Sequence, residues 1–490
     1  MTRPGLARAC TLAALLCCLL IPAAARAGAG QTSVTVGPDT FGRPIPRGFV
    51  GLSMEYRAVP AFAGTDPTAP NPIVVQLIRN LAPGQNPVLR IGGDSTDWSW
   101  WPVPGMRRPV WTRLTLSSSW VQIARALTQA TNAKLILGVN LEADNARLAA
   151  TMAHQLIAGL GSSSVQALEL GNEPELYASF GWYHTNTGQQ IPGRPSTWNP
   201  QAYAHDFANI ARSLPNVPLA GPSTGSPEWM SQLGSFLAAQ RRLGLVTLHR
   251  YPLRACTSTL ATAAQLLADS STTGLADSVA GYVRLAHARG LPLRIGEMGS
   301  VACGGAPGVS DAYASTLWAL DALFEMARVG VDGVNLHTAP NAVNELFSFT
   351  HLGGAWQGYV HPVYYGLMTF AQAAPAGSRL LRTTPPGAGG LKVWATKARD
   401  GHIRVLVINK DLTQSRSVAL SVPGAGPGTL QLLRAPSIAA KAGITLGGAG
   451  FGTTTTTGVL PAPTTATSLT RTSGRFRIHL APASAALLTL

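Results

Sequence analysis

The sequence predicts an α/β protein: a (β/α)8 TIM barrel followed by a C-terminal antiparallel β-sandwich domain. Between residues 48 and 375, eight short apolar runs alternate with segments of helical periodicity. From residue 376 to 490, short strands follow one another, separated by Gly, Pro and Asp. An open doubly wound sheet is the alternative for the first part, but eight evenly spaced units favour a closed barrel.

The chain begins with the pattern of a signal peptide, which we expect over residues 1–27. Arg3 and Arg8 flank the start of a short apolar run, and Ala25-Arg26-Ala27 matches an A-x-A cleavage site. The run is short for a membrane span of about 20 apolar residues. We therefore expect a secreted protein with no membrane association after cleavage near Ala27; a retained membrane anchor is the alternative. Residues 28–47 form an N-terminal β segment that could join the sandwich.

Removal of the leader changes the charge and the cysteine count. The formal net charge falls from +15 to +12, because three arginines and no acids are lost. Only Cys256 and Cys303 remain, and two cysteines in an exported chain favour a disulfide over two separate buried thiols. The positive charge suits an anionic polymer or simple solubility. No arginine-rich run or nucleic-acid motif occurs, so we expect no nucleic-acid partner.

The eight apolar runs are nearly continuous, as is typical of parallel strands that are covered on both faces. They span residues 49–56, 87–93, 134–142, 165–173, 217–223, 245–252, 291–297 and 332–338. Helices are predicted between them, for example over 120–132, 146–161 and 201–214. The clearest helix covers 310–330, with Ser310 as its N-cap and Gly330 after its end. In a barrel of this kind, functional residues lie at the carboxyl ends of the strands.

Short strands are predicted in the C-terminal domain in "LKVWATKA", "IRVLVINK", "SVALSV", "GTLQLLRA" and "FRIHLAPASAALLTL". Residues 447–468 are low in complexity and predict a long exposed loop.

Two glutamates end strands that face each other across the predicted barrel. Glu173 ends the fourth strand in "LELGNEP", and Glu297 ends the seventh in "LRIGEMGS". In retaining glycoside hydrolysis one carboxyl protonates the leaving oxygen and another, about 5–5.5 Å away, attacks the anomeric carbon. Asn172 can bind a sugar hydroxyl, and Tyr251 can donate a hydrogen bond to Glu297. A structural ion pair is the alternative for either glutamate alone, but the pair favours catalysis.

These motifs resemble glycoside hydrolase family 79, the heparanase and β-glucuronidase family. The resemblance covers nearly all of the mature chain, in order, through "FVGLSMEY", "LRIGGDSTD", "LILGVNL", "LELGNEPELY", "GEMGSVACGGAPGVSD", "VHPVYYGLMTF" and "LLRAPSIAAKAGITLGG". It implies that Glu173 is the acid/base, that Asn172 is its companion and that Glu297 is the nucleophile.

The resemblance also implies a sugar pocket. Glu55, Asp94 and Asp97 fall where the family lines this pocket, and the main-chain N–H groups of Gly304 and Gly305 match a loop that holds a uronate carboxylate. Ala302 and Cys303 depart from the tyrosine and glycine of several members. A Cys256–Cys303 bridge would hold this loop rigid without the tyrosine.

Three further residues are candidates for substrate contact. Arg250 could provide a cation for a carboxylate, although an ion pair with a barrel acid is the alternative. Trp98, in "DWSWW", could stack on a sugar or simply pack, and His337 ends the eighth strand, where it could contact substrate or be structural. The ten histidines show no HExxH or other compact metal spacing, so we expect no metal and no cofactor.

The sequence therefore predicts a secreted retaining glycoside hydrolase, an exo-acting β-glucuronidase or 4-O-methyl-glucuronidase on plant or animal acidic glycans. A retaining enzyme for a neutral sugar and an endo-acting heparanase-like enzyme are alternatives within the same chemistry. A catalytically inactive barrel that binds acidic polysaccharide is the alternative from another class.

Overall fold

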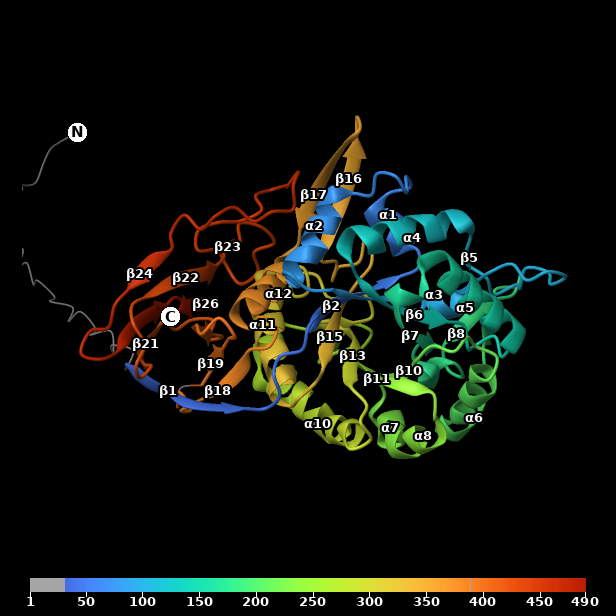
Figure 1. Ribbon diagram of the computed structural model, residues 1–490, viewed down its shortest axis with the longest axis horizontal. Helices are drawn as coiled ribbons and strands as arrows, with labels where there is room; N and C mark the ends of the chain where they lie inside the picture. Colours follow the sequence, from blue (N-terminus) through green and yellow to red (C-terminus); the bar gives the residue numbers. More distant parts are fainter. Residues whose placement is uncertain (1–30, 388) are drawn as a thin grey trace, which may run out of the picture.

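A computed structural model describes residues 31–387 and 389–490 of the chain. The predicted signal peptide lies outside the described residues. A barrel surrounded by helices and a domain made mainly of strands lie side by side (Figure 1). Within the described part of the chain, no helix has the length and apolar character needed to cross a membrane.

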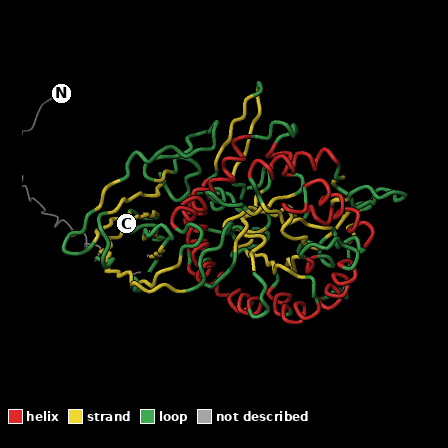
Figure 2. The backbone as a smooth tube through the Cα atoms, in the orientation of Figure 1, coloured by secondary structure: helices red, strands yellow, loops and turns green. Residues whose placement is uncertain are grey.

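Eight parallel strands close a barrel in the order β10-β11-β13-β15-β2-β3-β6-β7. In chain order they are β2 (Val50–Glu55), β3 (Val88–Gly92), β6 (Lys134–Val139), β7 (Val165–Leu170), β10 (Leu219–Thr224), β11 (Leu243–Arg250), β13 (Leu293–Met298) and β15 (Gly333–Thr338). Each strand falls within or close to one predicted run, so the predicted barrel is confirmed. The strands lie inside a ring of helices (Figure 2).

The interior of the barrel becomes more polar toward the carboxyl ends of the strands. An apolar layer lies near the amino ends, formed by Val88, Ile136, Ala167, Ala220 and Leu245. Residues two positions further along a strand point to the same side. The residues two positions after Val88, Ala167 and Leu245 are Arg90, Glu169 and Thr247, all fully buried. Ionisable groups are thereby directed into the barrel just below its mouth.

The helical layer consists of amphipathic helices with polar caps. Its members are α2 (Pro72–Leu81), α4 (Ser118–Thr131), α5 (Ala146–Leu160), α6 (Pro200–Ala211), α8 (Leu233–Ala239), α10 (Thr273–His287), α11 (Tyr313–Arg328) and α12 (Pro362–Ala373). Asn145 and Asn199 accept hydrogen bonds from main-chain N–H groups at the starts of α5 and α6. The predicted cap of α11 is wrong: its N-cap is Ala312, and Ser310 Oγ instead accepts a hydrogen bond from Ala306 N.

Short helices and strands lie in the loops of the barrel. They are α1 (Ala58–Ala63), α3 (Ser95–Trp98), β4 (Ser99–Trp100), β5 (Leu114–Thr115), η1 (Ser162–Ser164), η2 (Pro174–Leu176), β8 (Gly181–His184), β9 (Gln190–Pro192), α7 (Pro227–Ser231), β12 (Leu253–Arg254), α9 (Ala263–Leu267), η3 (Asp269–Ser271), β14 (Val301–Ala302), β16 (Phe347–Leu352) and β17 (Ala355–Val360). The β16–β17 hairpin projects from the body of the molecule (Figure 1).

The second domain is built from one folded sheet, with the main path β23-β22-β26-β20-β19-β18-β1-β21-β25 and β24 paired to β22. Its strands are β1 (Thr32–Phe41), β18 (Arg379–Thr383), β19 (Leu391–Lys397), β20 (Ile403–Asn409), β21 (Arg416–Ser421), β22 (Gly428–Arg434), β23 (Thr445–Leu446), β24 (Thr467–Leu469), β25 (Phe476–Leu480) and β26 (Ser484–Thr489). β1 pairs with β21 in parallel and with β18 antiparallel, so it connects two layers. Val34, Val393, Val405, Val418 and Phe476 share one apolar core between these layers.

Helix α11 joins the two domains. Phe324 on this helix stacks against Trp394 of β19 at 5.4 Å between ring centroids. Lys410 Nζ, after β20, lies 2.9 Å from the carboxylate of Asp321, which is 0% exposed. The helix is therefore covered by the barrel on one side and by the sheet domain on the other.

Candidate active site

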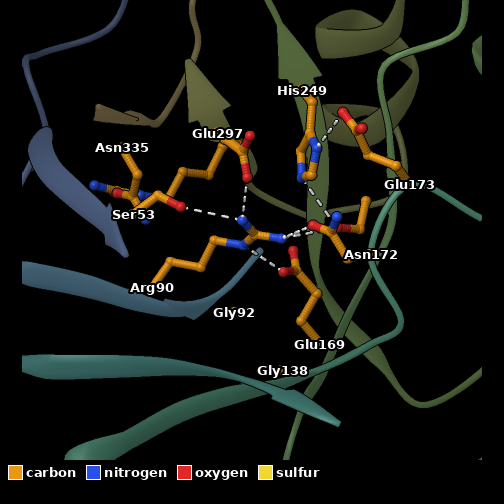
Figure 3. A network of polar contacts seen from close by, with 12 residues as sticks. Ser53, Arg90, Gly92, Gly138, Glu169, Asn172, Glu173, His249, Glu297 and Asn335 are labelled. Atoms are coloured by element: carbon orange, nitrogen blue, oxygen red, sulfur yellow. Dashed lines mark hydrogen bonds and ion pairs between the residues drawn. The ribbon is translucent and has the colours of Figure 1, made fainter. Parts of the chain in front are cut away.

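Arg90 is the centre of a hydrogen-bonded network beneath the barrel mouth (Figure 3). Its guanidinium is fully buried, and Nε donates to Glu169 Oε2 at 2.5 Å. Nη1 donates to Glu297 Oε2 at 2.7 Å and to Ser53 Oγ at 3.1 Å. Nη2 donates to Asn172 Oδ1 at 2.8 Å and to a fifth partner, Ser223 Oγ, at 3.2 Å. All five N–H groups of the guanidinium are therefore used, which fixes its position.

Glu297 lies at the carboxyl end of β13 and is held as a carboxylate. Tyr251 Oη donates to its Oε1 at 2.7 Å, and Arg90 donates to Oε2. Burial alone would raise the pKa of Glu297, but His337, His249, Arg90 and the Tyr251 hydrogen bond outweigh it and hold the pKa well below its usual value. An ionised, oriented carboxylate is the form that can attack an anomeric carbon.

Glu173 follows β7 and adopts a left-handed backbone conformation, with φ of +45°. This conformation is uncommon for a residue other than glycine and is often found at functional sites. Its side chain accepts from His249, whose Nδ1 lies 3.1 Å from Oε1, and the opposite ring nitrogen lies 3.0 Å from Ser223 Oγ. One side-chain ligand atom from each of Glu173, His249 and Glu297 lies within 4.8 Å of the other two.

Several predicted pocket residues surround this pair. Asn172 Nδ2 lies 3.3 Å from Asp94 Oδ1. Burial in the pocket, followed by the carboxylates of Glu55 and Glu173, raises the pKa of Asp94 well above its usual value, although its side chain still contacts solvent. His337 Nδ1 lies 3.5 Å from Glu297 Oε2. The structure therefore brings Glu55, Asp94, Asn172 and His337 to the catalytic pair.

Asp97 has a different place from the one predicted. It is 3% exposed, and its carboxylate accepts from the main-chain N–H groups of Leu141, Glu142 and Asn172 and from Tyr177 Oη. A carboxylate with four protein donors has little capacity left for a sugar hydroxyl. Asp97 therefore fixes the loops after β3, β6 and β7 and does not line the sugar pocket as predicted.

Arg250 also lies outside the site, which corrects the predicted substrate contact. Side chains alternate along β11, so His249 points into the barrel and Arg250 points away. Burial is the main cause that lowers the pKa of Arg250, and the titratable groups that influence it are Tyr282 and Arg254, not the carboxylates of the mouth.

Trp98 borders the mouth, but one of its faces is already covered. The guanidinium carbon of Arg113 lies 3.7 Å from the centre of the indole ring. A sugar could therefore stack only on the remaining face or edge of Trp98.

The predicted Cys256–Cys303 disulfide is present, with 5.8 Å between the Cα atoms. It connects the loops after β11 and β13, where β12 and β14 pair in parallel. Gly304 and Gly305 follow with φ of +85° and +92°. A Cβ at position 305 would lie 2.9 Å from Asn344 N, so only glycine fits this turn. In the described structure we find no acceptor for the N–H groups of these two glycines.

Sequence reasoning did not identify Arg90, Glu169, Ser223 or His249 as part of the site. One signal was present: Arg90 and Glu169 are charged residues inside otherwise apolar strands, and buried charges are nearly always paired. The pairing partners could not be assigned, because they lie on different strands.

A cation at the mouth would be held by Glu173, His249 and Glu297, whose ligand atoms are the ones within 4.8 Å of one another. Each of these atoms is close to a protein group that competes for it. Arg90 and Tyr251 bind Glu297, and Ser223 and Glu173 bind the two ring nitrogens of His249. Arg90 is one of the groups that place positive charge beside the nucleophile.

A barrel with two glutamates at the ends of β7 and β13, one ionised and both close enough to flank a single sugar, has the arrangement of a retaining glycoside hydrolase. The protein is an enzyme of this class. Residues 393–487 match the model of the glycosyl hydrolase family 79 C-terminal beta domain. This match confirms the predicted resemblance to glycoside hydrolase family 79.

Two proteins with similar sequences are β-glucuronidases. A β-glucuronidase of Aspergillus niger is 24% identical over 408 residues, which cover 76% of this chain and 73% of that protein. A β-glucuronidase of Neurospora crassa is 24% identical over 350 residues, 63% of this chain and 60% of that protein.

Solved structures share the fold. A 4-O-α-L-rhamnosyl-β-D-glucuronidase from Fusarium oxysporum superposes with a TM-score of 0.75 at 20% identity, over 94% of this chain and 100% of that chain. An arabinofuranosidase of family 51 from Xanthomonas axonopodis superposes with a TM-score of 0.64 at 15% identity, over 94% and 99% of the two chains.

Proposed function

We propose that the protein is a secreted, exo-acting β-glucuronidase that releases glucuronic acid or 4-O-methyl-glucuronic acid from acidic glycans with retention of configuration. The observation that carries this proposal is the Glu173–Glu297 pair, which places a catalytic acid and a nucleophile within 4.8 Å at the barrel mouth. The two β-glucuronidase relatives support glucuronide as the substrate class.

The reaction proceeds in two displacements. Glu297 attacks the anomeric carbon and forms a glycosyl ester while Glu173 gives its proton to the leaving oxygen. Glu173, now a carboxylate, then takes a proton from a water molecule, whose oxygen attacks the same carbon and releases Glu297. Two inversions restore the β configuration. Glu173 gives up a proton in the first step and regains one from water in the second, so it ends the cycle protonated.

The surroundings of each residue suit its role. The low pKa of Glu297 keeps it ionised over the physiological range. Burial raises the pKa of Tyr251 well above its usual value, so its hydroxyl remains a donor. His249 orients Glu173 through a 3.1 Å contact. Asn172 is held by Arg90 next to the acid and can bind a hydroxyl of the sugar in the site.

The loop of residues 303–305 supports recognition of the uronate. Its three consecutive residues all have positive φ and lie in the loop after β13. N–H groups without a protein acceptor are suitable donors to a carboxylate. The disulfide at Cys303 fixes the start of this loop.

Secretion is supported by the predicted leader and by the disulfide, which persists in oxidising compartments. N-terminal sequencing of the exported protein should give a start near Gly28. An intact leader on the exported protein would contradict cleavage at Ala27.

A panel of aryl β-glycosides tests the activity. Wild type should hydrolyse the glucuronide and not the glucoside or galactoside, and Glu297→Ala should hydrolyse none of them. Release from a neutral glycoside would contradict uronate specificity. No turnover of any glycoside, with salt-sensitive polysaccharide binding, would indicate a binding protein instead.

A further inference from the structure

A narrow second pocket opens beside Glu173. Its walls come from the loops after β3, β6 and β7 and include Asp94, Trp98, Glu142, Glu173, Phe180 and Trp182. We call this pocket the acidic recess. Its volume is about 30 Å³, which suits a hydroxyl group and is too small for a sugar ring. Glu297 is not among its lining residues, so the recess lies beside the reacting centre and does not coincide with it.

Glu142 is the unusual member of the acidic recess. It is 6% exposed, it lines the recess, and its carboxyl group has no hydrogen-bond or ion-pair partner in the described part of the chain. A Cβ at position 193 would lie 2.1 Å from Glu142 Oε1, so Gly193 leaves the space that this carboxyl group occupies. A buried polar group that faces a cavity without a protein partner is suited to a ligand.

The charged groups around Glu142 leave the recess without a cation. Burial, with Asp97 as the next cause, raises the pKa of Glu142 to about 9, against the opposing effect of Arg194 and Arg113. Arg194 donates to main-chain oxygens and to Asp206 Oδ2 at 3.3 Å. Arg113 stacks on Trp98 and donates to Trp182 O. None of the lining residues is basic.

The rim of the recess is apolar and open. Phe180 is 56% exposed and Leu176 is 38% exposed, and both border the recess. Apolar and aromatic side chains next to a few polar groups are the usual surroundings of a bound sugar.

We propose that the acidic recess binds an uncharged hydroxyl group of the substrate next to the scissile bond, with Glu142 as its hydrogen-bond partner, and excludes a sulfate there. The proposal rests on the proposed glucuronidase function. Because Glu173 serves the glycosidic oxygen, the hydroxyl group can belong to the glucuronosyl ring or to the leaving-group sugar. In either case a sulfate would be too large for the recess, whose volume is about 30 Å³, and no lining residue could provide a cation for it, which costs binding.

Four substrates test the proposal: 4-nitrophenyl β-glucuronide, its 2-O-sulfate, a β-glucuronosyl-galactose, and the same disaccharide with a sulfate on galactose. Each is assayed for kcat/KM with wild type, Glu142→Ala, Glu142→Gln and the control Asp39→Asn. The control removes an exposed carboxylate from β1 in the other domain. The sulfate penalty is the ratio of kcat/KM for an unsulfated parent to that for its sulfate.

Wild type and Asp39→Asn should show a sulfate penalty of about tenfold or more in one pair of substrates, and that pair identifies the sugar that enters the recess. Glu142→Ala should shrink this penalty and lower kcat/KM for the unsulfated parent of that pair about tenfold relative to the other parent. Glu142→Gln, which keeps a donor of the same shape, should recover most of this loss.

Equal rates for sulfated and unsulfated substrates in wild type would overturn the inference. An equal loss on both parents in Glu142→Ala would also overturn it, because that result indicates a structural role. These outcomes leave the glucuronidase function standing, since they require hydrolysis of the parents. Failure of wild type to hydrolyse either glucuronide would instead overturn the proposed function.

Discussion

Arg90 helps to keep the nucleophile ionised, and its one guanidinium is shared between two carboxylates. It contacts Glu169 at 2.5 Å and Glu297 at 2.7 Å, and all three groups are buried. Burial alone would lower the pKa of Arg90, but the two carboxylates raise it, so the cation persists. Glu169 shares this positive charge, and His337 and His249 act with Arg90 to hold the pKa of Glu297 low.

Replacement of Tyr251 by Phe should change the pH dependence of the reaction. The hydrogen bond from Tyr251 helps to hold the pKa of Glu297 low, so its loss raises that pKa. Catalysis needs ionised Glu297, and the acidic limb of the kcat/KM profile therefore moves to higher pH. We expect a loss in kcat of about 10- to 100-fold, and a larger loss at the acidic end of the profile than at pH 7.

Tyr313→Phe is the matched control for Tyr251→Phe. It also removes a buried hydroxyl, which donates to Leu433 O at 2.8 Å, but it lies on α11 outside the mouth. Its pH profile should match wild type. The same displacement of the acidic limb in both variants would contradict a specific role for Tyr251.

The site residues that could be predicted are those that stand at the end of a predicted strand, because that position indicates the barrel mouth. Glu173, Asn172, Tyr251 and Glu297 each follow or end an apolar run, and the structure brings them together. Asp97 fits the same pattern, yet its carboxylate is occupied by main-chain donors from two other loops. Loop packing of this kind involves partners about 45 and 75 residues away in the chain, so no local pattern could reveal it.

The strands of the barrel were easier to predict than the faces on which each helix is buried. The barrel strands are buried on both faces, which leaves an apolar signature in each run. Helix α11 shows why helices are harder: its bounds were predicted, but fifteen of its sixteen residues are buried, which its sequence did not indicate. Its second face is covered by β19 and neighbouring strands of another domain, and the sequence does not say which domain packs there.

Loss of the disulfide should loosen the loop after β13. Cys256→Ser with Cys303→Ser removes the covalent bond, whereas the β12–β14 pair and the hydrogen bond from Ala255 N to Ala302 O remain. We expect stability to fall by about 2–4 kcal/mol, measured by urea unfolding. KM for an aryl glucuronide should rise more than kcat falls, because the loop positions the proposed uronate donors.

An unchanged KM in the double serine variant would contradict this role of the loop. Thiol titration provides the internal check: denatured wild type should expose no free thiol from Cys256 or Cys303 before reduction, and two after it.

The two domains are held together partly by buried charge. Lys410 is 5% exposed, and its ammonium group lies 2.7 Å from Asp269 and 2.9 Å from Asp321 of the barrel domain. Lys392 lies 3.1 Å from Glu325 beside them. Strand β1 adds a covalent constraint, because the chain passes through the sheet domain at β1 before it enters the barrel. The composition of residues 28–47 indicated a strand, but its partners could only be known from the fold.

Replacement of Lys410 by Met should destabilise the molecule strongly. It leaves the carboxylate of Asp321, which is 0% exposed, without its cation, and such a loss costs about 3–5 kcal/mol. Lys397→Met, an exposed lysine of the same domain, is the control and should change the free energy of unfolding by less than about 0.5 kcal/mol. Equal effects in urea unfolding would contradict the importance of the buried pair.

The configuration of the first product tests the whole account most directly. Wild type is mixed with an aryl β-glucuronide, and the anomeric proton of the released sugar is followed by NMR before mutarotation. A nucleophilic Glu297 and an acid/base Glu173 predict that β-glucuronic acid appears first and that the α anomer grows only later. Initial release of α-glucuronic acid would mean direct attack by water, and it would contradict the roles assigned to both glutamates.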